Sequence, residues 1–131
     1  MSVRVGIDLT SVDEVVEALA AHGDRYLRRV FTAREVDDCR DADGVVDPQR
    51  LAARFAAKEA ALKALAAPPD VGLALTSVEV TEGERGEPEL VLAAQAAELA
   101  RRAGIGALSV SLTHERAYAA AVVVAETGMR T

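Results

Sequence analysis

Residues that could do chemistry gather in one segment, residues 51–65, which the spacing of its apolar side chains predicts to be a helix. At about 100° per residue, four apolar side chains fall on one arc of the helix surface: Leu51, Phe55, Leu62 and Leu65. Lys58 falls inside this arc and Glu59 lies at its edge. Because an unpaired charge is costly to bury, these groups should either pair with each other or bind a ligand.

The elements around this helix follow from periodicity. Residues 3–9 alternate between aliphatic and polar side chains, which predicts a half-buried strand with Asp8 pointing away from its aliphatic face. Thr10 or Ser11 can cap a helix that ends near Gly23, with Glu14 placed as in a capping box, and Thr32 with Glu35 should open a short helix to about residue 40. A further helical segment is expected over residues 25–30. A polar loop over residues 41–47 should precede the long helix, which runs for about 18 residues from Pro48. The sequence Pro-Pro-Asp at residues 68–70 should end it.

The second half of the chain reads mostly as strands. Residues 75–81 and 89–92 form a predicted hairpin around a turn at residues 82–88. An amphipathic helix over residues 93–103 should end at Gly104. Residues 108–113 then alternate, and the almost wholly apolar residues 118–125 are typical of a central strand buried on both faces. We therefore expect one α+β domain over residues 1–131, with an antiparallel sheet packed against one long and several short helices.

Composition narrows the function classes. The 131 residues are half hydrophobic but only 3% aromatic, so the core must use small aliphatic side chains, and burial against copies of the chain is an option. A net charge of −6 argues against nucleic-acid binding. The single cysteine, Cys39, cannot form an intramolecular disulfide, and neither a signal peptide nor a membrane span is evident. We expect a soluble cytoplasmic protein without membrane contact.

Three motifs occur in order along the chain. Residues 5–8 read Val-Gly-Ile-Asp, residues 54–64 read Arg-Phe-x-x-Lys-Glu-Ala-x-x-Lys-Ala, and residues 110–115 read Val-Ser-Leu-Thr-His-Glu. An Arg-x-Phe-Thr-x-x-Glu stretch lies between them at residues 29–35. Together these motifs resemble the holo-acyl-carrier-protein synthases, the small-subunit class of 4′-phosphopantetheinyl transferases, over nearly the whole chain.

The resemblance implies a fold, a reaction and a metal. Such enzymes transfer the phosphopantetheine arm of coenzyme A to a serine of a carrier protein and release 3′,5′-adenosine bisphosphate. Asp8 and Glu59 would be metal ligands, because few hard oxygen donors suit a Mg²⁺ that also binds phosphate. Taken alone, Asp8 could be a strand-end cap, and Glu59 could form an i,i+4 salt bridge with Lys63.

The resemblance also supplies candidate phosphate contacts. Lys63 would lie near the pyrophosphate and stabilise the leaving phosphate, while Arg54, Lys58 and His114 would hold the phosphates and the nucleotide of coenzyme A. Ser111 is a further candidate contact. Arg54 and Lys58 could instead form a solvated ridge, and His114 and Ser111 could be structural. The general base remains open between a metal-bound water, Asp8 and Glu115.

Carrier proteins of this family are acidic, so Arg25, Arg28 and Arg29 are candidate docking residues. The chain departs from the family in two places. Asp13 and Glu14 stand where an arginine is common, and residues 66–69 read Ala-Ala-Pro-Pro where a glycine-rich turn is common. These departures suggest a particular carrier, such as one of a polyketide or multidomain system, rather than the general fatty-acid carrier.

The family is typically a homotrimer in which neighbouring subunits share each site, and we expect the same here. The alternatives are a non-catalytic homologue that binds coenzyme A or a carrier, and a small trimeric structural domain. The retention of Asp8, Glu59 and Lys63 argues against a pure binding protein.

Overall fold

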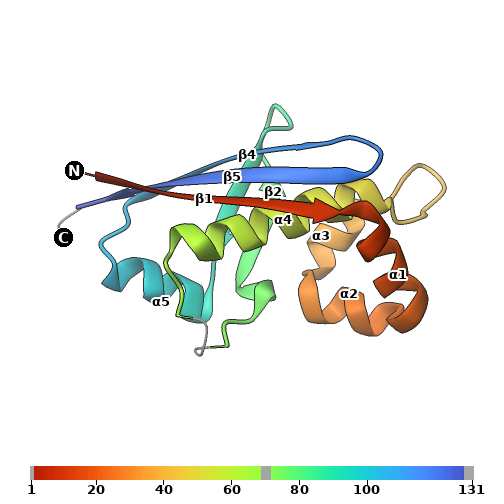
Figure 1. Cartoon of the computed structure of the whole chain (residues 1–131), viewed down its shortest axis with the longest axis horizontal. Helices are drawn as coiled ribbons and strands as arrows, with labels where there is room; N and C mark the ends of the chain where they lie inside the picture. The colour runs from red at the N-terminus through yellow and green to blue at the C-terminus, as the bar shows by residue number, and fades with distance from the viewer. Residues whose placement is uncertain (1, 69–71, 129–131) are drawn as a thin grey trace.

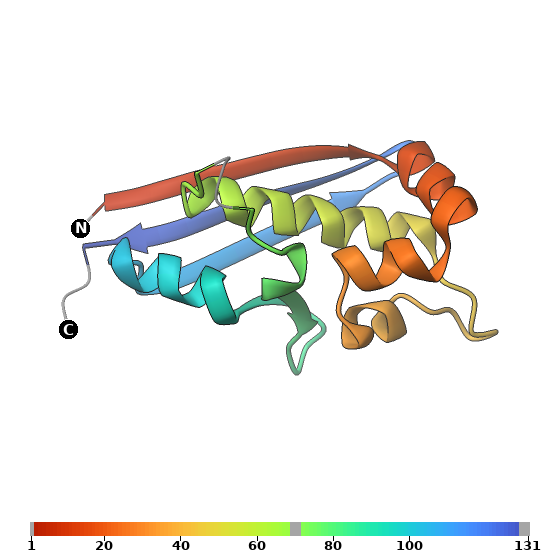
Figure 2. The ribbon, with the colours of Figure 1, turned by 90° about the horizontal axis from the view of Figure 1, so that it is seen from below.

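A three-stranded antiparallel sheet covers one side of the long helix α4 (Pro48–Ala64) in the computed structural model, which describes residues 2–68 and 72–128. The sheet has the order β1 (Ser2–Ser11), β5 (Tyr118–Thr127) and β4 (Ala107–His114). Figures 1 and 2 show α4 running along one face of this sheet. The α+β class, the antiparallel pairing and the long helix predicted from the sequence are therefore confirmed.

Helix α4 begins and ends as its sequence predicts. Asp47 accepts a hydrogen bond from the backbone N–H of Gln49, and Pro48 occupies the first turn, where it costs no intrahelical hydrogen bond. The helix ends at Ala64, before Pro68; the expected stop signals at residues 69 and 70 lie outside the described residues. Its buried face is built largely from alanines, which lets the sheet approach the helix closely: Ala56, Ala57, Ala60, Ala61 and Ala64.

Helices α1 (Val12–His22), α2 (Asp24–Val30) and α3 (Ala33–Asp38) pack beside the N-terminal half of α4 (Figure 1). The predicted caps are present. The Ser11 hydroxyl accepts from the backbone N–H of Glu14, and Thr32 and Glu35 form a full capping box. Gly23, with φ of 51°, separates α1 from α2.

The hairpin consists of β2 (Val78–Glu82) and β3 (Pro88–Leu92), and it is followed by α5 (Ala94–Arg102). The expected strand start at Leu75 is wrong, because Leu75–Ser77 forms a 3₁₀ turn, η1, in which Ser77 N–H donates to the carbonyl of Ala74. The turn directs the chain into β2 from beneath α4 (Figure 2).

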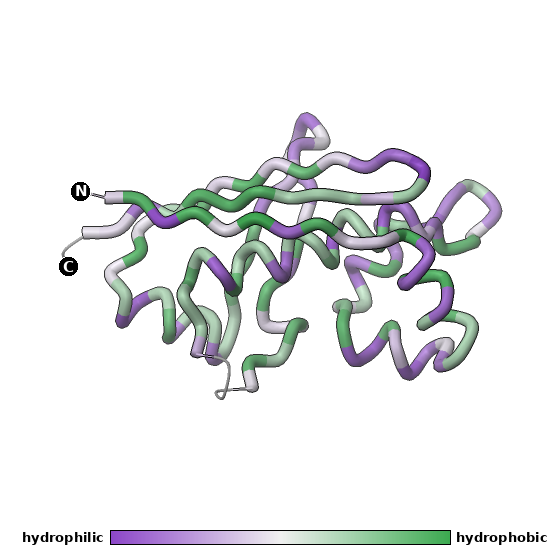
Figure 3. Tube along the Cα trace, viewed as in Figure 1, coloured by the Kyte–Doolittle hydropathy of each residue, from purple (hydrophilic) through white to green (hydrophobic). Residues whose placement is uncertain are grey.

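Two predicted burial patterns need correction. Strand β5 is central, but its side chains alternate between buried and half-buried, because α4 covers one face of the sheet and not the other. Strand β1 turns its aliphatic residues away from α4, so they are 58–67% exposed rather than buried: Val3, Val5, Ile7 and Leu9. Figure 3 shows the alternating hydropathy along this strand. The opposite face of β1, with Gly6, Asp8 and Thr10, lies against α4.

Within the described ranges, 2–68 and 72–128, no helix has the length and apolar character required to cross a bilayer.

Candidate functional site

Asp8 lies on the face of β1 that packs against α4, and its side chain is 17% exposed. The hydroxyl of Thr10 donates a 2.7 Å hydrogen bond to one carboxylate oxygen. The ammonium of Lys63 lies 3.4 Å from the other oxygen and also donates to the carbonyl of Ile7 at 2.9 Å. The strand therefore presents a carboxylate whose orientation is fixed from two sides.

Glu59 lies close to this carboxylate, on the exposed edge of α4. Partial burial raises the pKa of Glu59, the charge of Asp8 raises it further, and Lys63 lowers it. Two like charges held near each other repel, and a cation between them would relieve that repulsion. Glu59 and Lys63 also line a cavity of about 300 Å³ with residues near the end of α4: Leu62, Ala67, Pro68, Gly72 and Leu73.

Lys63 is the residue that joins the strand to the helix at this site. Its side chain is half exposed and contacts Asp8 rather than forming the i,i+4 pair with Glu59 considered from the sequence. A cation next to two carboxylates partly compensates their charge. Lys63 is also exposed enough to reach an anionic ligand in the neighbouring cavity.

Lys58 does not fit the role expected for it. Its side chain is fully buried and pairs with Glu35, 2.6 Å away, which is also fully buried. Burial lowers the pKa of Lys58, and the charge and hydrogen bond of Glu35 oppose this shift. With no exposed surface, Lys58 cannot reach a phosphate in this structure, so we do not include it among the ligand-binding residues.

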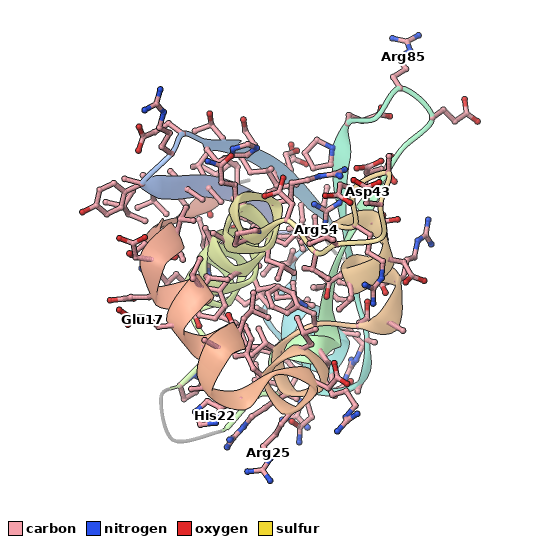
Figure 4. All side chains as sticks on the ribbon, turned by 90° about the vertical axis from the view of Figure 1, so that its right-hand side faces the viewer. Glu17, His22, Arg25, Asp43, Arg54 and Arg85 are labelled. Atoms are coloured by element: carbon pink, nitrogen blue, oxygen red, sulfur yellow. The ribbon has the colours of Figure 1, made fainter. Side chains whose placement is uncertain are left out.

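Arg54 is likewise buried, so the solvated ridge with Lys58 is not formed. Its guanidinium lies 3.3 Å from Glu82, and Arg50 lies 3.9 Å from the same carboxylate. Figure 4 shows Arg54 directed into the interior at the end of α4, in contrast with the outward Arg25. In the described part of the chain, the buried Arg54 Nε has no hydrogen-bond partner.

Ser111 and His114 are not brought to Asp8 and Glu59 within one chain. Both lie on β4, which is separated from β1 by the whole width of β5. The register pairs Ser111 with Val122 and Val122 with Ile7, which places Ser111 on the outer face of the sheet, opposite Asp8. His114 is exposed at the end of β4.

The three candidate docking arginines lie together on α2, where all are exposed: Arg25, Arg28 and Arg29. Figure 4 shows Arg25 extending from the molecule beside His22. Glu14 is exposed on the neighbouring helix α1. An acidic partner that contacts α2 could therefore meet a negative charge on α1.

Asp8 and Glu59 fit a metal that needs few protein ligands. Among the residues described, no group of three or more His, Cys, Asp or Glu side chains is placed to hold a metal ion by itself. Two carboxylates near each other nevertheless match Mg²⁺, which retains water ligands and binds substrate phosphates. A tetrahedral zinc site, with its nitrogen and sulfur ligands, does not fit these donors.

Sequence reasoning missed the partners of the buried charges. Glu35 was recognised as half of a capping box, but its pairing with Lys58 required the fold to bring α3 against α4. The contact between Arg54 and Glu82 joins residues 28 positions apart and has no local signal. The position of Lys58 inside the apolar arc was the available clue, because it demanded a partner.

Comparison with known proteins places these motifs in a family. A family model described as the 4′-phosphopantetheinyl transferase superfamily matches residues 4–123. The chain is 44% identical over 125 residues to a holo-[acyl-carrier-protein] synthase of Frankia casuarinae, covering 95% of this chain and 98% of the relative. It is 36% identical to the synthase of Maridesulfovibrio salexigens over 126 residues, covering 96% and 99%.

Solved structures agree in fold. The chain superimposes with a TM-score of 0.80 on the holo-[acyl-carrier-protein] synthase of Helicobacter pylori in complex with coenzyme A. That match has 26% sequence identity and covers 93% of this chain and 99% of the other.

Proposed function

Because this chain belongs to the holo-[acyl-carrier-protein] synthase family within the 4′-phosphopantetheinyl transferase superfamily, we propose that it transfers the 4′-phosphopantetheine arm of coenzyme A to a serine of an apo carrier protein. The reaction is Mg²⁺-dependent and releases 3′,5′-adenosine bisphosphate. The observation that carries the proposal is the convergence of Asp8, Glu59 and Lys63 from β1 and α4. We also propose that residues 1–131 form one catalytic domain and that the protein acts in the cytoplasm.

The two carboxylates are the proposed metal ligands. A bound Mg²⁺ would neutralise charge on the pyrophosphate and make it a better electrophile. Asp8 is held for this role by Thr10, and Glu59 must be ionised to take part. Both residues are close enough to each other for one charge to affect the other, as a shared cation requires.

Lys63 is the proposed group that stabilises the leaving phosphate. It is anchored to the carbonyl of Ile7, so its charge is fixed before the substrate arrives. The hydroxyl oxygen of the carrier serine bonds to the β-phosphorus of coenzyme A. As this bond forms, the bond between that phosphorus and the bridging oxygen breaks, and negative charge develops on the departing phosphate. The proton of the serine goes to a base that remains open between a metal-bound water, Asp8 and Glu115.

The proposed assembly is a homotrimer with shared sites. The outer face of the sheet is the proposed subunit contact, because it exposes the aliphatic residues of β1 and, on the other side of β5, hydroxyls of β4. Ser111 lies on this face, whereas His114 is exposed at the end of β4, where its register partner Ala119 is buried on the other side of the sheet. We propose that both residues complete the site of a neighbouring chain. Arg54 remains a proposed nucleotide contact. Its buried Nε has no hydrogen-bond partner among the described residues, although its terminal Nη2 already donates to Glu82.

The proposed partner is an acidic carrier protein that docks on Arg25, Arg28 and Arg29 of α2. The positive charge of this helix would steer the carrier toward the site. Asp13 and Glu14 on α1 introduce the opposite charge next to it. We therefore propose a carrier with a modified docking surface, such as one from a polyketide system.

Intact-mass spectrometry of apo carrier proteins tests the function. Each carrier is incubated with coenzyme A, Mg²⁺ and wild-type protein, Glu59→Gln, or Glu84→Gln as a matched control on the exposed β2–β3 turn. We expect a gain of one phosphopantetheine arm with the wild type and the control, and a loss of at least about 100-fold in rate with Glu59→Gln. Coenzyme A binding without transfer would favour the non-catalytic alternative.

Subunit complementation tests the shared site. Glu59→Gln and His114→Ala would each be inactive, and mixing them with exchange of subunits should restore part of the activity if the two residues act across an interface. A mixture as inactive as its components, with exchange verified, would show that each site is built within one chain.

A further inference from the structure

The proposed reaction does not use the ion pair between Glu35 and Lys58, although Lys58 lies on α4, the helix that carries Glu59 and Lys63. Both side chains have no exposed surface, and their charged atoms lie 2.6 Å apart. Lys58 precedes Glu59 directly in the sequence. An interior position for two charges demands an explanation, because removing each ion from water is costly and their attraction repays that cost only when the geometry is excellent.

Oxygen atoms surround the Lys58 ammonium. It has three protons, and three acceptors surround it: Glu35 at 2.6 Å, the carbonyl of Leu75 at 3.0 Å and the carbonyl of Val78 at 2.6 Å. The ring of Phe31 lies 5.7 Å away, within the range of a cation–π contact. The ammonium therefore joins α4 to α3, η1 and β2 at one point.

Glu35 is anchored equally firmly. One carboxylate oxygen accepts from the backbone N–H of Thr32 at 2.8 Å and the other accepts from the backbone N–H of Val80 at 2.7 Å. The carboxylate is thus fixed to two backbone segments before Lys58 binds to it. A directional contact between Lys58 and such a rigid acceptor fixes the orientation of α4. Apolar packing against the small alanines of α4 fixes that orientation less well.

The geometry of α4 connects this anchor to the site. Glu59 follows Lys58 by about 100° around the helix and Lys63 follows it by about 140°, so anchoring Lys58 on one side sets the direction of both site residues. Side chains reach roughly 5–6 Å from a helix axis, so a rotation of about 10° would move a carboxylate by about 1 Å. Displacements of this size can cost on the order of 100-fold in rate.

We propose that the buried Glu35–Lys58 pair is a positioning unit that fixes the rotation of α4 and so aims Glu59 and Lys63 at Asp8. The inference rests on the proposed function, because it assigns these three residues to the transfer site. Lys58 touches no substrate in this assignment. It acts through the helix that carries the site residues.

Chemical labelling of the wild-type protein gives a first test. Lys58 and Lys63 are the two lysines of the chain, so reductive methylation followed by peptide mass spectrometry reads each separately. We expect Lys63, whose side chain is 56% exposed, to be methylated in the free protein and Lys58 to stay unmodified with or without coenzyme A and Mg²⁺. Methylation of Lys58 that coenzyme A suppresses would place Lys58 in the ligand site and overturn the proposal.

Kinetics of Lys58→Met give the second test, because methionine keeps the length of the side chain and removes its charge. We expect kcat to fall about 10- to 100-fold and half-activation by Mg²⁺ to need more metal, while KM for coenzyme A changes less than about 3-fold. Ala100→Gly, a buried change on α5, is the matched control: it should lower thermal stability and keep kcat.

The outcomes separate positioning from stability. A kcat for Lys58→Met equal to that of Ala100→Gly, or a rise in KM alone, would overturn the proposal. Glu35→Gln serves as a second variant and should reproduce the loss of kcat. If neither variant folds at 10 °C, the pair is a requirement for the whole fold, and this result would also overturn the proposal. A wild-type protein that transfers nothing would refute the proposed function instead, and the labelling pattern would still report on the pair.

Discussion

Lys58 and Lys63 lie five residues apart on α4, but their surroundings give them different chemistry. Lys58 is enclosed with Glu35, whereas Lys63 is half exposed and contacts Asp8. The ammonium groups have the same ordinary affinity for protons and phosphates. Burial leaves Lys63, and not Lys58, accessible to a ligand.

The pH dependence of activity should report the environment of Glu59. An ionised carboxylate is needed to bind Mg²⁺, and a raised pKa means that protonation begins at a higher pH than for an ordinary glutamate. Activity should therefore fall on acidification. Because Lys63 lowers the pKa of Glu59, Lys63→Gln should move this acid limb to higher pH.

Calorimetry of Mg²⁺ binding between pH 5 and pH 8 measures this pH dependence, because the loss of Mg²⁺ affinity on acidification can be followed without turnover. Arg102→Gln, which removes an exposed cation on α5, is the control and should leave the limb where it is. A shift to lower pH in Lys63→Gln would contradict the assigned electrostatics.

At the scale of elements, the site depends on how closely β1 approaches α4. Gly6 lies against the helix at Ala60 and Ala64, and a Cβ at this position would overlap the carbonyl oxygen of Ala60. The glycine and the alanines remove the side chains that would hold the two elements apart. Asp8, two residues further along the strand, is thereby brought to Lys63.

Gly6→Ala should therefore destabilise the protein by about 2–3 kcal/mol and lower activity, because the strand must move away from the helix. Gly44→Ala is the control: its φ of 80° is strained for alanine, but nothing lies within contact distance, so about 1 kcal/mol is expected. Urea denaturation followed by circular dichroism measures both. Equal losses in the two variants would show that the close approach is unimportant.

Helix α1 carries a prediction about the carrier. If Glu14 repels the usual acidic carrier, Glu14→Arg should raise the kcat/KM for that carrier, by up to about 10-fold at low salt, and the gain should shrink as salt increases. Glu84→Arg introduces the same charge on the exposed β2–β3 turn and should give a much smaller gain. No improvement, or a loss, in Glu14→Arg would argue against docking beside α1.

For the whole molecule, the outer face of the sheet is the feature that a single chain leaves unexplained. Aliphatic side chains on β1 are more than half exposed there, and a contiguous apolar face of this kind is characteristic of an interaction surface. Self-association would cover it. The proposed shared site further requires Ser111 and His114 of one chain to approach the carboxylates of another.

Val5→Asp should disrupt this assembly, because a charge would be buried in an apolar contact. Val5 is 59% exposed in one chain, and Val45, in the loop before α4, is similarly exposed at 61%. Val45→Asp is therefore the matched control and should keep the wild-type mass. Size-exclusion chromatography with light scattering measures the masses; a wild-type protein that is already monomeric would refute the trimer.

Local interactions fixed much of this protein, and the sequence by itself was enough to predict them. Caps at Ser11 and Thr32 and the proline at position 48 mark three helix starts, and the alternation along β1 and β4 defines two strands. The ordered motifs also predicted the family, which the comparisons with known proteins confirmed. Each of these signals is contained in a few consecutive residues or in the order of the motifs.

The tertiary structure decided which side chains are accessible to a ligand or partner. Lys58 and Arg54 match the family motif as well as Lys63 does, yet both are buried because α3 and the hairpin close over the N-terminal half of α4. The aliphatic face of β1 looked like a core face, but α4 packs against the other side. Periodicity distinguishes two faces of a strand or helix; only the packing of distant segments determines which face is covered and which charges find a partner.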